Sequence, residues 1–253
     1  MNKKFRLFSL VLSTLVLVVV LGFASCSKSD DKNDNPNPPQ PHEPWSPDPE
    51  NGELPESVLP AELVDVVGEY FTIYGGDDPA PVVGQFVSSP HALIATSVDP
   101  TYVFPDSVEV YNDRYICFER TSNGLVNFYG KQWDNEYNAF YEEVYRDLNS
   151  VGSGDNFTCY YLTEGYPNGM YALQSTIFSG IWNDTLGGLK DFQVAVILLE
   201  TSGNPNLYPV NSYRILGDFD GLAENNNWMG KEATTDKDMT APEHDAFWMF
   251  RRK

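Results

Sequence analysis

The chain has 253 residues, of which 16 are Lys or Arg and 36 are Asp or Glu, so its formal net charge is −20 and its pI is near 4.3. Because so acidic a chain is repelled by phosphate backbones, nucleic acid is excluded as a partner. Three cysteines and three histidines are too few for a disulfide-rich scaffold or a dense metal cluster. Aromatic residues make up 14% of the chain, which indicates a folded protein.

The N-terminus has the pattern of an export signal. Three basic residues among the first six precede an apolar run over residues 7–21, and small residues then lead to Cys26. The run is shorter than the roughly 20 residues that a membrane-spanning helix needs, so residues 1–25 read as a signal peptide. The ending Ala24-Ser25-Cys26 resembles the bacterial lipobox, in which the cysteine is lipidated and becomes the mature N-terminus; the alternative is an ordinary signal.

A short acidic tract at residues 27–32 follows Cys26 and resembles the export tract of Bacteroidota surface lipoproteins. The resemblance implies an outer-membrane protein that is lipid-anchored and exposed on the cell surface, with a periplasm-facing anchor as the alternative. Each buried methylene contributes about 0.8 kcal/mol, so several acyl chains on one residue attach a protein stably. Cleavage before Cys26 would leave 13 basic and 36 acidic residues, a net charge of −23.

Composition divides the mature chain into a linker and one domain. Residues 26–60 hold nine prolines and few aliphatic side chains. Such a segment cannot bury enough apolar area to offset its ordering entropy, so we expect a Pro-rich disordered linker. Residues 61–253 are expected to form a single β-rich globular domain, which begins with a short helix at 61–67 between Pro60 and Gly68.

Most of the domain has the pattern of short strands separated by turn residues. Strands are expected at 69–74, 82–87, 92–96, 107–111, 114–120, 125–131, 157–163, 170–178, 192–199, 212–219 and 246–251. The nearly continuous apolar run 192–199 should be central, with both faces covered. Asn123-Gly124 is a strong hairpin signal, and Asn112-Asp113 is a second turn candidate. The fold class is mostly β, a single antiparallel β-sandwich or barrel; the closed version is lipocalin-like in architecture alone.

Residues 134–148 have a different periodicity. Tyr137, Phe140, Tyr141, Val144, Tyr145 and Leu148 recur at spacings of three and four. This spacing is typical of an amphipathic helix, with Asp134 as its N-cap. We expect one helix at about 134–148 that packs its aromatic side against the sheet.

Two groups of residues could carry a metal ion or a crosslink. Asp218, Asp220 and Glu224 lie around a D-x-D-G turn, which brings two carboxylates to one point and suits calcium; a solvated turn is the alternative. Cys117 and Cys159 lie in expected strands of an exported chain, where a disulfide can form if those strands are adjacent. The alternative is two separate buried thiols.

No catalytic residue is assigned. His91 with Ser89 or Ser97 lacks the sequence context of a Ser-His-acid triad. The aromatic residues are more suggestive, because Trp133, Trp182 and Trp228 lie at expected strand ends or loops, where an indole can present a flat face to a sugar ring. The alternative is that these tryptophans cap the hydrophobic core at the strand ends.

The sequence therefore favours a non-catalytic surface lipoprotein that binds a ligand, with a polysaccharide or another envelope protein as the partner and no cofactor other than calcium. The alternatives are a secreted glycan-active hydrolase, which would need two carboxyl groups roughly 5–10 Å apart in a cleft, and a structural component of an envelope complex.

Overall fold

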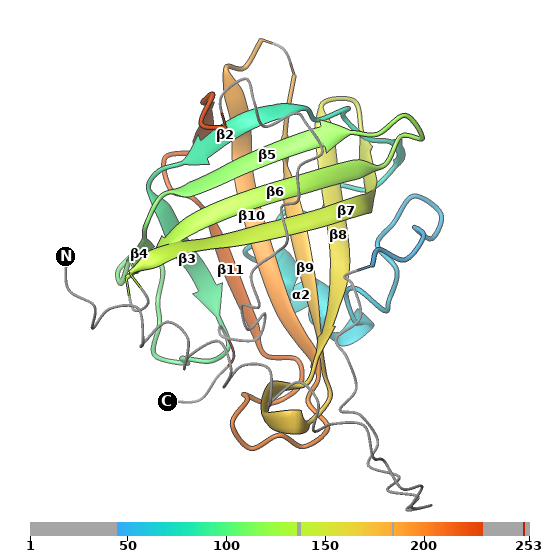
Figure 1. Ribbon diagram of the computed structural model, residues 1–253. Coiled ribbons are helices and arrows are strands. Elements are labelled where there is room, and N and C mark those ends of the chain that lie inside the picture. Colours follow the sequence, from blue (N-terminus) through green and yellow to red (C-terminus); the bar gives the residue numbers. More distant parts are fainter. Residues whose placement is uncertain (1–44, 136–137, 184, 230–249, 251–253) are drawn as a thin grey trace, which may run out of the picture. The chain divides into compact units, whose positions relative to one another are not determined.

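The computed structural model describes residues 45–135, 138–183, 185–229 and 250 (Figure 1). The signal segment, Cys26 and the acidic tract lie outside these residues, as does the strand expected at 246–251 apart from Phe250. The elements are α2 (Ala61–Gly68), β1 (Asp77–Asp78), β2 (Gly84–Ser88), β3 (His91–Thr96), β4 (Val110–Tyr111), β5 (Arg114–Arg120), β6 (Val126–Asp134), β7 (Ala139–Ser153), β8 (Asn156–Gly165), the 3₁₀ turn η1 (Pro167–Gly169), β9 (Ala172–Ile181), β10 (Gly188–Glu200), β11 (Tyr213–Asp218) and β12 (Leu222–Asn225). Within the described residues, no helix has the length and apolar character needed to span a membrane.

Apart from β1, which pairs in parallel with β7, the strands form one closed antiparallel barrel of eight strands, so the barrel alternative is confirmed (Figure 1). Each strand pairs with the next one along the chain from β5 to β10, and β12 closes the ring by pairing with β10 and β2. Three barrel strands bend and carry two labels each: β2 continues into β3, β4 into β5, and β11 into β12. A barrel of eight strands has an interior that side chains can fill or that can hold one small ligand.

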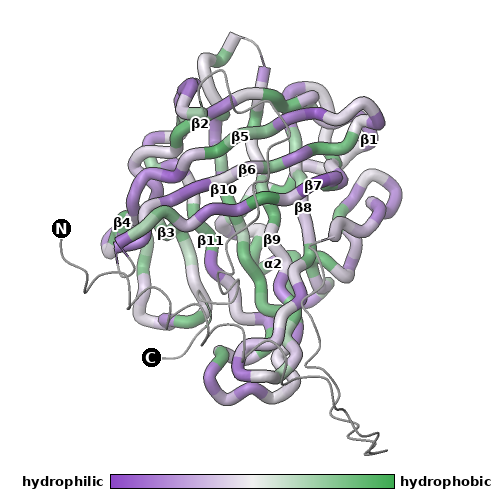
Figure 2. The backbone as a smooth tube through the Cα atoms, in the orientation of Figure 1, coloured by the Kyte–Doolittle hydropathy of each residue, from purple (hydrophilic) through white to green (hydrophobic). Residues whose placement is uncertain are grey.

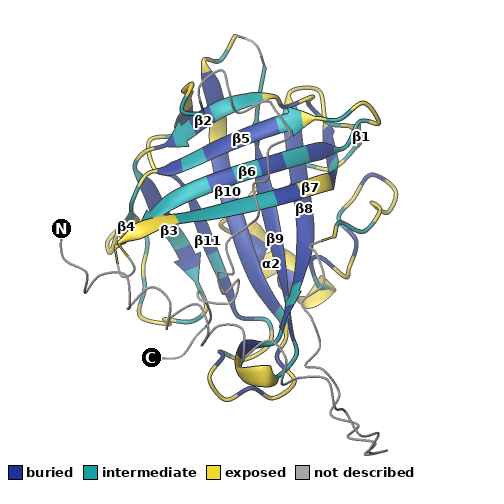
Figure 3. Ribbon diagram, viewed as in Figure 1, coloured by how far each residue is buried: buried dark blue, intermediate teal, exposed yellow. Residues whose placement is uncertain are grey.

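Strand β10 separates two apolar layers. Its alternate residues Val194, Val196 and Leu198 face the interior of the barrel, while Ala195 and Ile197 face an outer layer. The interior layer includes seven phenylalanines that are entirely buried: Phe86, Phe118, Phe128, Phe157, Phe178, Phe192 and Phe250. Figure 2 shows the hydrophobic stretches along β9 and β10, and Figure 3 shows how thoroughly these strands are buried. The prediction that 192–199 is a central strand covered on both faces is confirmed.

Helix α2 covers the outer layer, and the short helix expected here is confirmed. Leu63 and Val67, four residues apart, lie on the same side of the helix and are buried. They pack with outward-facing residues of β8 to β11, among them Tyr160 and Ile177. One wall of the barrel is therefore buried on both sides, while the outer surface of β5, β6 and β7 lies apart from this layer.

The helix expected at 134–148 is wrong, because the segment forms the hairpin of β6 and β7. The misleading spacing combines residues from both faces of β7, since Phe140 and Val144 face outward whereas Tyr141 and Tyr145 face inward, and a β-bulge at the middle of the strand adds to it. Asn127 alone lies opposite two residues of β7, and one of these, Asp147, has a φ of 55°. The extra residue resets the alternation, so Leu148 is buried only three residues after the buried Tyr145. Inward positions three residues apart on a bulged strand imitate a helical face.

The domain begins earlier than composition suggested. Trp45 forms a β-bridge with Leu162 on β8, and the Ser46 hydroxyl donates to the carbonyl of Tyr160 at 2.7 Å. Val58 and Leu59 are buried in the outer apolar layer. The linker boundary at residue 60 is therefore wrong, since ordered contacts begin at Trp45 despite the high proline content.

The turn predictions have mixed outcomes. Asn123-Gly124 does join β5 to β6, and Gly124 adopts the positive φ of 88° that the turn needs. Asn112-Asp113 is not a hairpin turn: β4 and β5 lie on either side of it in one bent strand and pair with β3 and β2. Residues 69–74 are not a strand; the chain there bonds instead to side chains of the barrel wall, such as Gln193.

Candidate functional site

An aromatic cluster lies on the outer surface of the β5–β7 wall. It consists of Tyr115 on β5, Lys131 and Trp133 on β6, Phe140 on β7 and Trp228 after β12, and we call these five residues the aromatic face. Tyr115 is the cross-strand partner of Lys131, and Trp133 is that of Phe140. Because residues in register across a sheet share a side, the alternation that sends the neighbouring phenylalanines inward sends these side chains outward.

Lys131 is the centre of the aromatic face. Its Nζ lies 4.7 Å from the ring centroid of Trp228, 5.0 Å from that of Phe140 and 5.3 Å from that of Tyr115. Cation–π contacts of this kind contribute about 0.5–1 kcal/mol each at exposed sites. The rings meet edge to face, with centroids 5.2 Å apart for Trp133 and Phe140 and 5.8 Å apart for Tyr115 and Trp228. Each ring of the face therefore contacts at least one other member of the cluster.

The aromatic face remains open to solvent. Phe140 is 45% exposed, and Tyr115, Lys131, Trp133 and Trp228 are all partly exposed. The Trp228 indole is fixed by its Nε1–H, which donates to the carbonyl of Ile116 at 3.0 Å. A set of exposed rings in fixed positions is suited to binding a partner, because little side-chain entropy is lost when the partner docks.

Two of the three tryptophans predicted as ligand-binding residues, Trp133 and Trp228, meet on the aromatic face. Trp182 lies elsewhere, at the end of β9, where its backbone N–H donates to the carbonyl of Asp155 and its ring packs against the barrel interior. Sequence reasoning missed Phe140 as a member of the face, because a helix was expected there. A strand at 139–153 would have placed it opposite Trp133.

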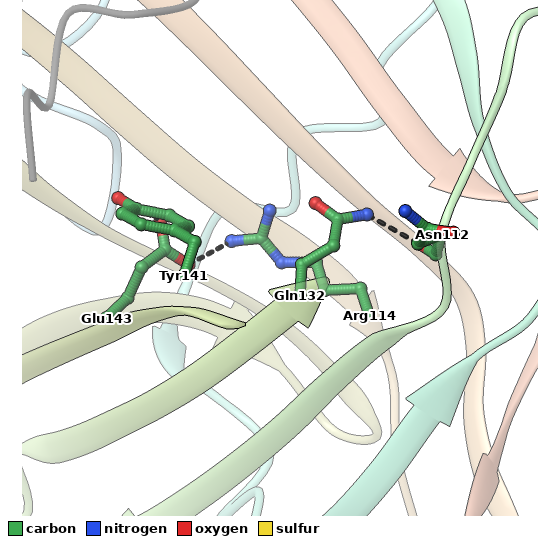
Figure 4. A network of polar contacts seen from close by, with 5 residues as sticks. All are labelled: Asn112, Arg114, Gln132, Tyr141 and Glu143. Carbon is green, nitrogen blue, oxygen red and sulfur yellow. Dashed lines mark hydrogen bonds and ion pairs between the residues drawn. The ribbon is translucent and has the colours of Figure 1, made fainter. Parts of the chain in front are cut away.

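Inside the same wall lies a buried ion pair. The Arg114 guanidinium donates to the Glu143 carboxylate, and their side chains are only 5% and 10% exposed. The Tyr141 hydroxyl donates to the same carboxylate at 3.2 Å, and the Gln132 side chain donates to the carbonyl of Asn112 at 2.6 Å. Figure 4 shows Arg114 between Gln132 and the Tyr141–Glu143 pair. These groups form a polar region within an otherwise aromatic interior.

The groups beside this ion pair have displaced pKa values. Tyr145 and Tyr161 stack with centroids 3.7 Å apart, and burial first, then nearby negative charge that includes Glu143, raises both phenol pKa values well above 10. Burial and the positive charge of Arg114 hold the pKa of His91 well below 6.5. These side chains are therefore neutral at pH 7, and the ion pair carries the formal charge of this region.

His91 is a structural residue. Its Nδ1 lies 3.0 Å from the hydroxyl of Ser88, which is neither of the two serines considered with it from the sequence; of those two, Ser97 accepts a hydrogen bond from the N–H of Tyr213. Ser88 and His91 are both 0% exposed, so a substrate cannot reach them. They lie where β2 bends into β3 and support that bend.

The structure brings two of the predicted calcium ligands, Asp218 and Asp220, into contact, but it does not gather all three as a metal site. Asp218 is buried, and its two oxygens accept the backbone N–H groups of Ser89 and Leu222. Burial, followed by a hydrogen bond with Asp220, raises the pKa of Asp218 to about 6. Glu224 is exposed on β12. In the part of the chain that the structure describes, no three His, Cys, Asp or Glu side chains gather as metal ligands. The aspartates close the β11–β12 bend instead.

The predicted disulfide between Cys117 and Cys159 is wrong, because both cysteines are free and buried. Cys117 lies on β5 and Cys159 on β8, with β6 and β7 between them. Burial, with a smaller contribution from Glu119, raises the pKa of Cys117 to about 12, and burial raises the pKa of Cys159 as well. Neutral thiols in these positions act as small apolar side chains.

Comparison of the chain with protein-family models, curated proteins and solved structures finds no significant match in any of the three.

Proposed function

We propose that the protein is a lipid-anchored surface lipoprotein of the outer membrane and a non-catalytic binding module whose aromatic face takes a polysaccharide. The observation that carries the proposal is the convergence of Trp133, Phe140, Trp228 and Tyr115 around Lys131 on the solvent side of the barrel. The rings come from three strands and a following segment, so the barrel itself holds them in place.

The chemistry of the face suits sugars. Pyranose rings have apolar faces of C–H groups and a rim of hydroxyls. Aromatic rings can pack against the C–H faces, and polar side chains near the rings can hydrogen-bond to the hydroxyls. Toward a sugar hydroxyl, Lys131 offers hydrogen-bond donors, and Glu142, its cross-strand neighbour on β7, offers acceptors. Both kinds of group therefore lie within the same few strands.

The interior of the barrel favours binding over hydrolysis. Glycoside hydrolysis needs a pair of carboxyl groups that reach the substrate. Glu143 is engaged by Arg114 and Tyr141, and the oxygens of Asp218 are engaged by backbone N–H groups. These two buried carboxylates already have structural roles, so neither is assigned a catalytic role in this proposal.

Affinity gel electrophoresis in native gels cast with individual polysaccharides tests the proposal. Phe140→Ala and Trp133→Ala should each weaken the retardation of the chain by at least about fivefold in apparent affinity, because a central aromatic contact is commonly worth more than 1 kcal/mol. Phe219→Ala is the matched control, since Phe219 is 46% exposed and lies near Phe104, away from the aromatic face. Equal retardation of all three variants would contradict the proposal.

The anchor is tested separately. Labelled palmitate should enter the wild-type protein, and Cys26→Ala should abolish the label and release the protein from the envelope. Ser29→Ala, three residues further on, should change neither result. A Cys26→Ala protein that stays on the envelope would remove the lipid anchor from the proposal and leave the aromatic face unaffected.

A further inference from the structure

The interior of the barrel contains buried polar atoms without hydrogen-bond partners. Seven side chains of the described residues have such an atom; Tyr160 and Ser175 belong to the outer side of β8 and β9, and the other five atoms are His91 Nε2, Arg114 Nε, Thr163 Oγ1, Gln174 Oε1 and Arg214 Nε. Four of these five residues are at least nine-tenths buried, with exposures of 0% for His91, 4% for Arg114, 6% for Gln174 and 8% for Thr163. Native proteins pair nearly all such groups with protein, water or ligand.

The strand register shows that these groups face the inside of the barrel. Thr163 on β8 is the cross-strand partner of Gln174 on β9, and Gln174 is that of Leu198 on β10. Arg214 on β11 is the partner of Val196. Val196 and Leu198 belong to the interior apolar layer, and partners in register lie on the same side of a sheet. The unsatisfied atoms of Thr163, Gln174 and Arg214 therefore lie along one inner wall.

Arg214 indicates the charge of the missing partner. It donates to the Tyr111 hydroxyl over a long 3.4 Å, its Nε has no hydrogen-bond partner, and it is only partly exposed. The carboxylate of Glu109 hydrogen-bonds to the same Tyr111 hydroxyl, so the phenol lies between this carboxylate and Arg214. Arg114, by contrast, is paired directly with Glu143. A planar guanidinium with free donors matches a carboxylate, which it can hold with two parallel bonds.

We propose that the barrel interior binds a small carboxylic acid with an apolar body. Its carboxylate takes the free donors of Arg214, and its apolar part lies against Val196 and Leu198, the interior neighbours of Arg214 and Gln174. A hydroxyl on the acid would satisfy Gln174 Oε1, which can only accept. Eight-stranded barrels either fill their interior with side chains or hold one small ligand, and the unpartnered polar atoms favour the second arrangement here.

Isothermal titration of the mature chain carrying Cys26→Ala tests this site without detergent. Octanoate and 1-octanol are the probes, since they share a chain and differ in the carboxylate. Octanoate should bind at least tenfold more tightly than 1-octanol, and 3-hydroxyoctanoate more tightly again. Arg214→Gln should weaken octanoate binding at least tenfold. Arg120→Gln, the same change at an exposed position of β5, should leave the octanoate affinity unchanged. Arg214→Lys keeps the positive charge but lacks the planar guanidinium, so its affinity for octanoate should lie between those of wild type and Arg214→Gln.

Equal binding of octanoate and 1-octanol, or octanoate binding that survives Arg214→Gln, would overturn the assignment. The absence of any heat or thermal stabilisation with millimolar octanoate would mean that water alone satisfies these atoms. The site is independent of the aromatic face, so Phe140→Ala should leave octanoate binding intact and Arg214→Gln should leave polysaccharide binding intact.

Discussion

Replacing Glu143 by glutamine leaves the shape of the side chain and removes its charge. Arg114, whose side chain is 5% exposed, then keeps a guanidinium inside the barrel with only an amide in place of its carboxylate. Another neighbour is the Phe178 ring, 6.0 Å away, which cannot replace an anion. Breaking a buried pair by removing one partner costs about 3–5 kcal/mol. Because the amide oxygen still accepts a bond, we expect Glu143→Gln to lower the free energy of unfolding by about 3 kcal/mol.

The double variant separates the cost of the orphaned charge from the value of the pair. Arg114→Met with Glu143→Leu removes both charges and keeps the volume apolar, and such replacements are often neutral. We expect the double variant to lie within about 1.5 kcal/mol of wild type and above the single variant.

Urea unfolding of the chain lacking residues 1–26, followed by near-ultraviolet circular dichroism, measures these differences. Glu224→Gln, the same chemical change on the exposed side of β12, is the control and should stay within about 0.5 kcal/mol of wild type. A cost below about 1 kcal/mol for Glu143→Gln, or a double variant less stable than the single one, would refute the reasoning.

Three further predictions follow from single positions. Gly130→Ala should destabilise the chain by about 1–3 kcal/mol in the same urea assay, because its Cβ would lie 2.8 Å from the Phe128 ring; an unchanged midpoint would show that the ring moves freely. His91 is held neutral, so the unfolded chain binds a proton below pH 6.5 that the folded chain does not; between pH 7.5 and 5.0 wild type should lose about 2 kcal/mol more than His91→Gln, and parallel pH profiles would contradict this. Cys117 and Cys159 should both react with maleimide in urea without prior reduction, whereas a requirement for reductant would indicate a disulfide.

Strands with a simple local pattern were predictable from sequence. The segment 114–120 coincides with β5, and the apolar run 192–199 lies within β10, because burial on both faces leaves an unmistakable composition. The bends between β2 and β3 and between β11 and β12 were not predictable. The carboxylate of Asp218 closes them through backbone groups more than one hundred residues apart, and in the sequence it looks like an ordinary turn residue.

The candidate sites show the same limit. Trp133 and Trp228 were identified from their residue type and their place at expected strand ends or loops, whereas Phe140 required the correct register of the β6–β7 hairpin. Arg114 and Glu143 are 29 residues apart and resemble surface residues of exposed strands. Only the closure of the barrel shows that they face inward, because alternation alone does not say which side of a strand is covered.

The most direct test of the binding proposal is nuclear magnetic resonance of the tryptophan indole N–H groups, whose signals are assigned by substitution. The protein is titrated with an oligosaccharide derived from a polysaccharide that retards it in the affinity gel. The resonances of Trp133 and Trp228 should shift together and saturate with one affinity, while that of Trp182, on another part of the barrel, should stay in place. A shift confined to Trp182, or saturable binding that moves neither Trp133 nor Trp228, would contradict the assignment of the aromatic face as the ligand-binding surface.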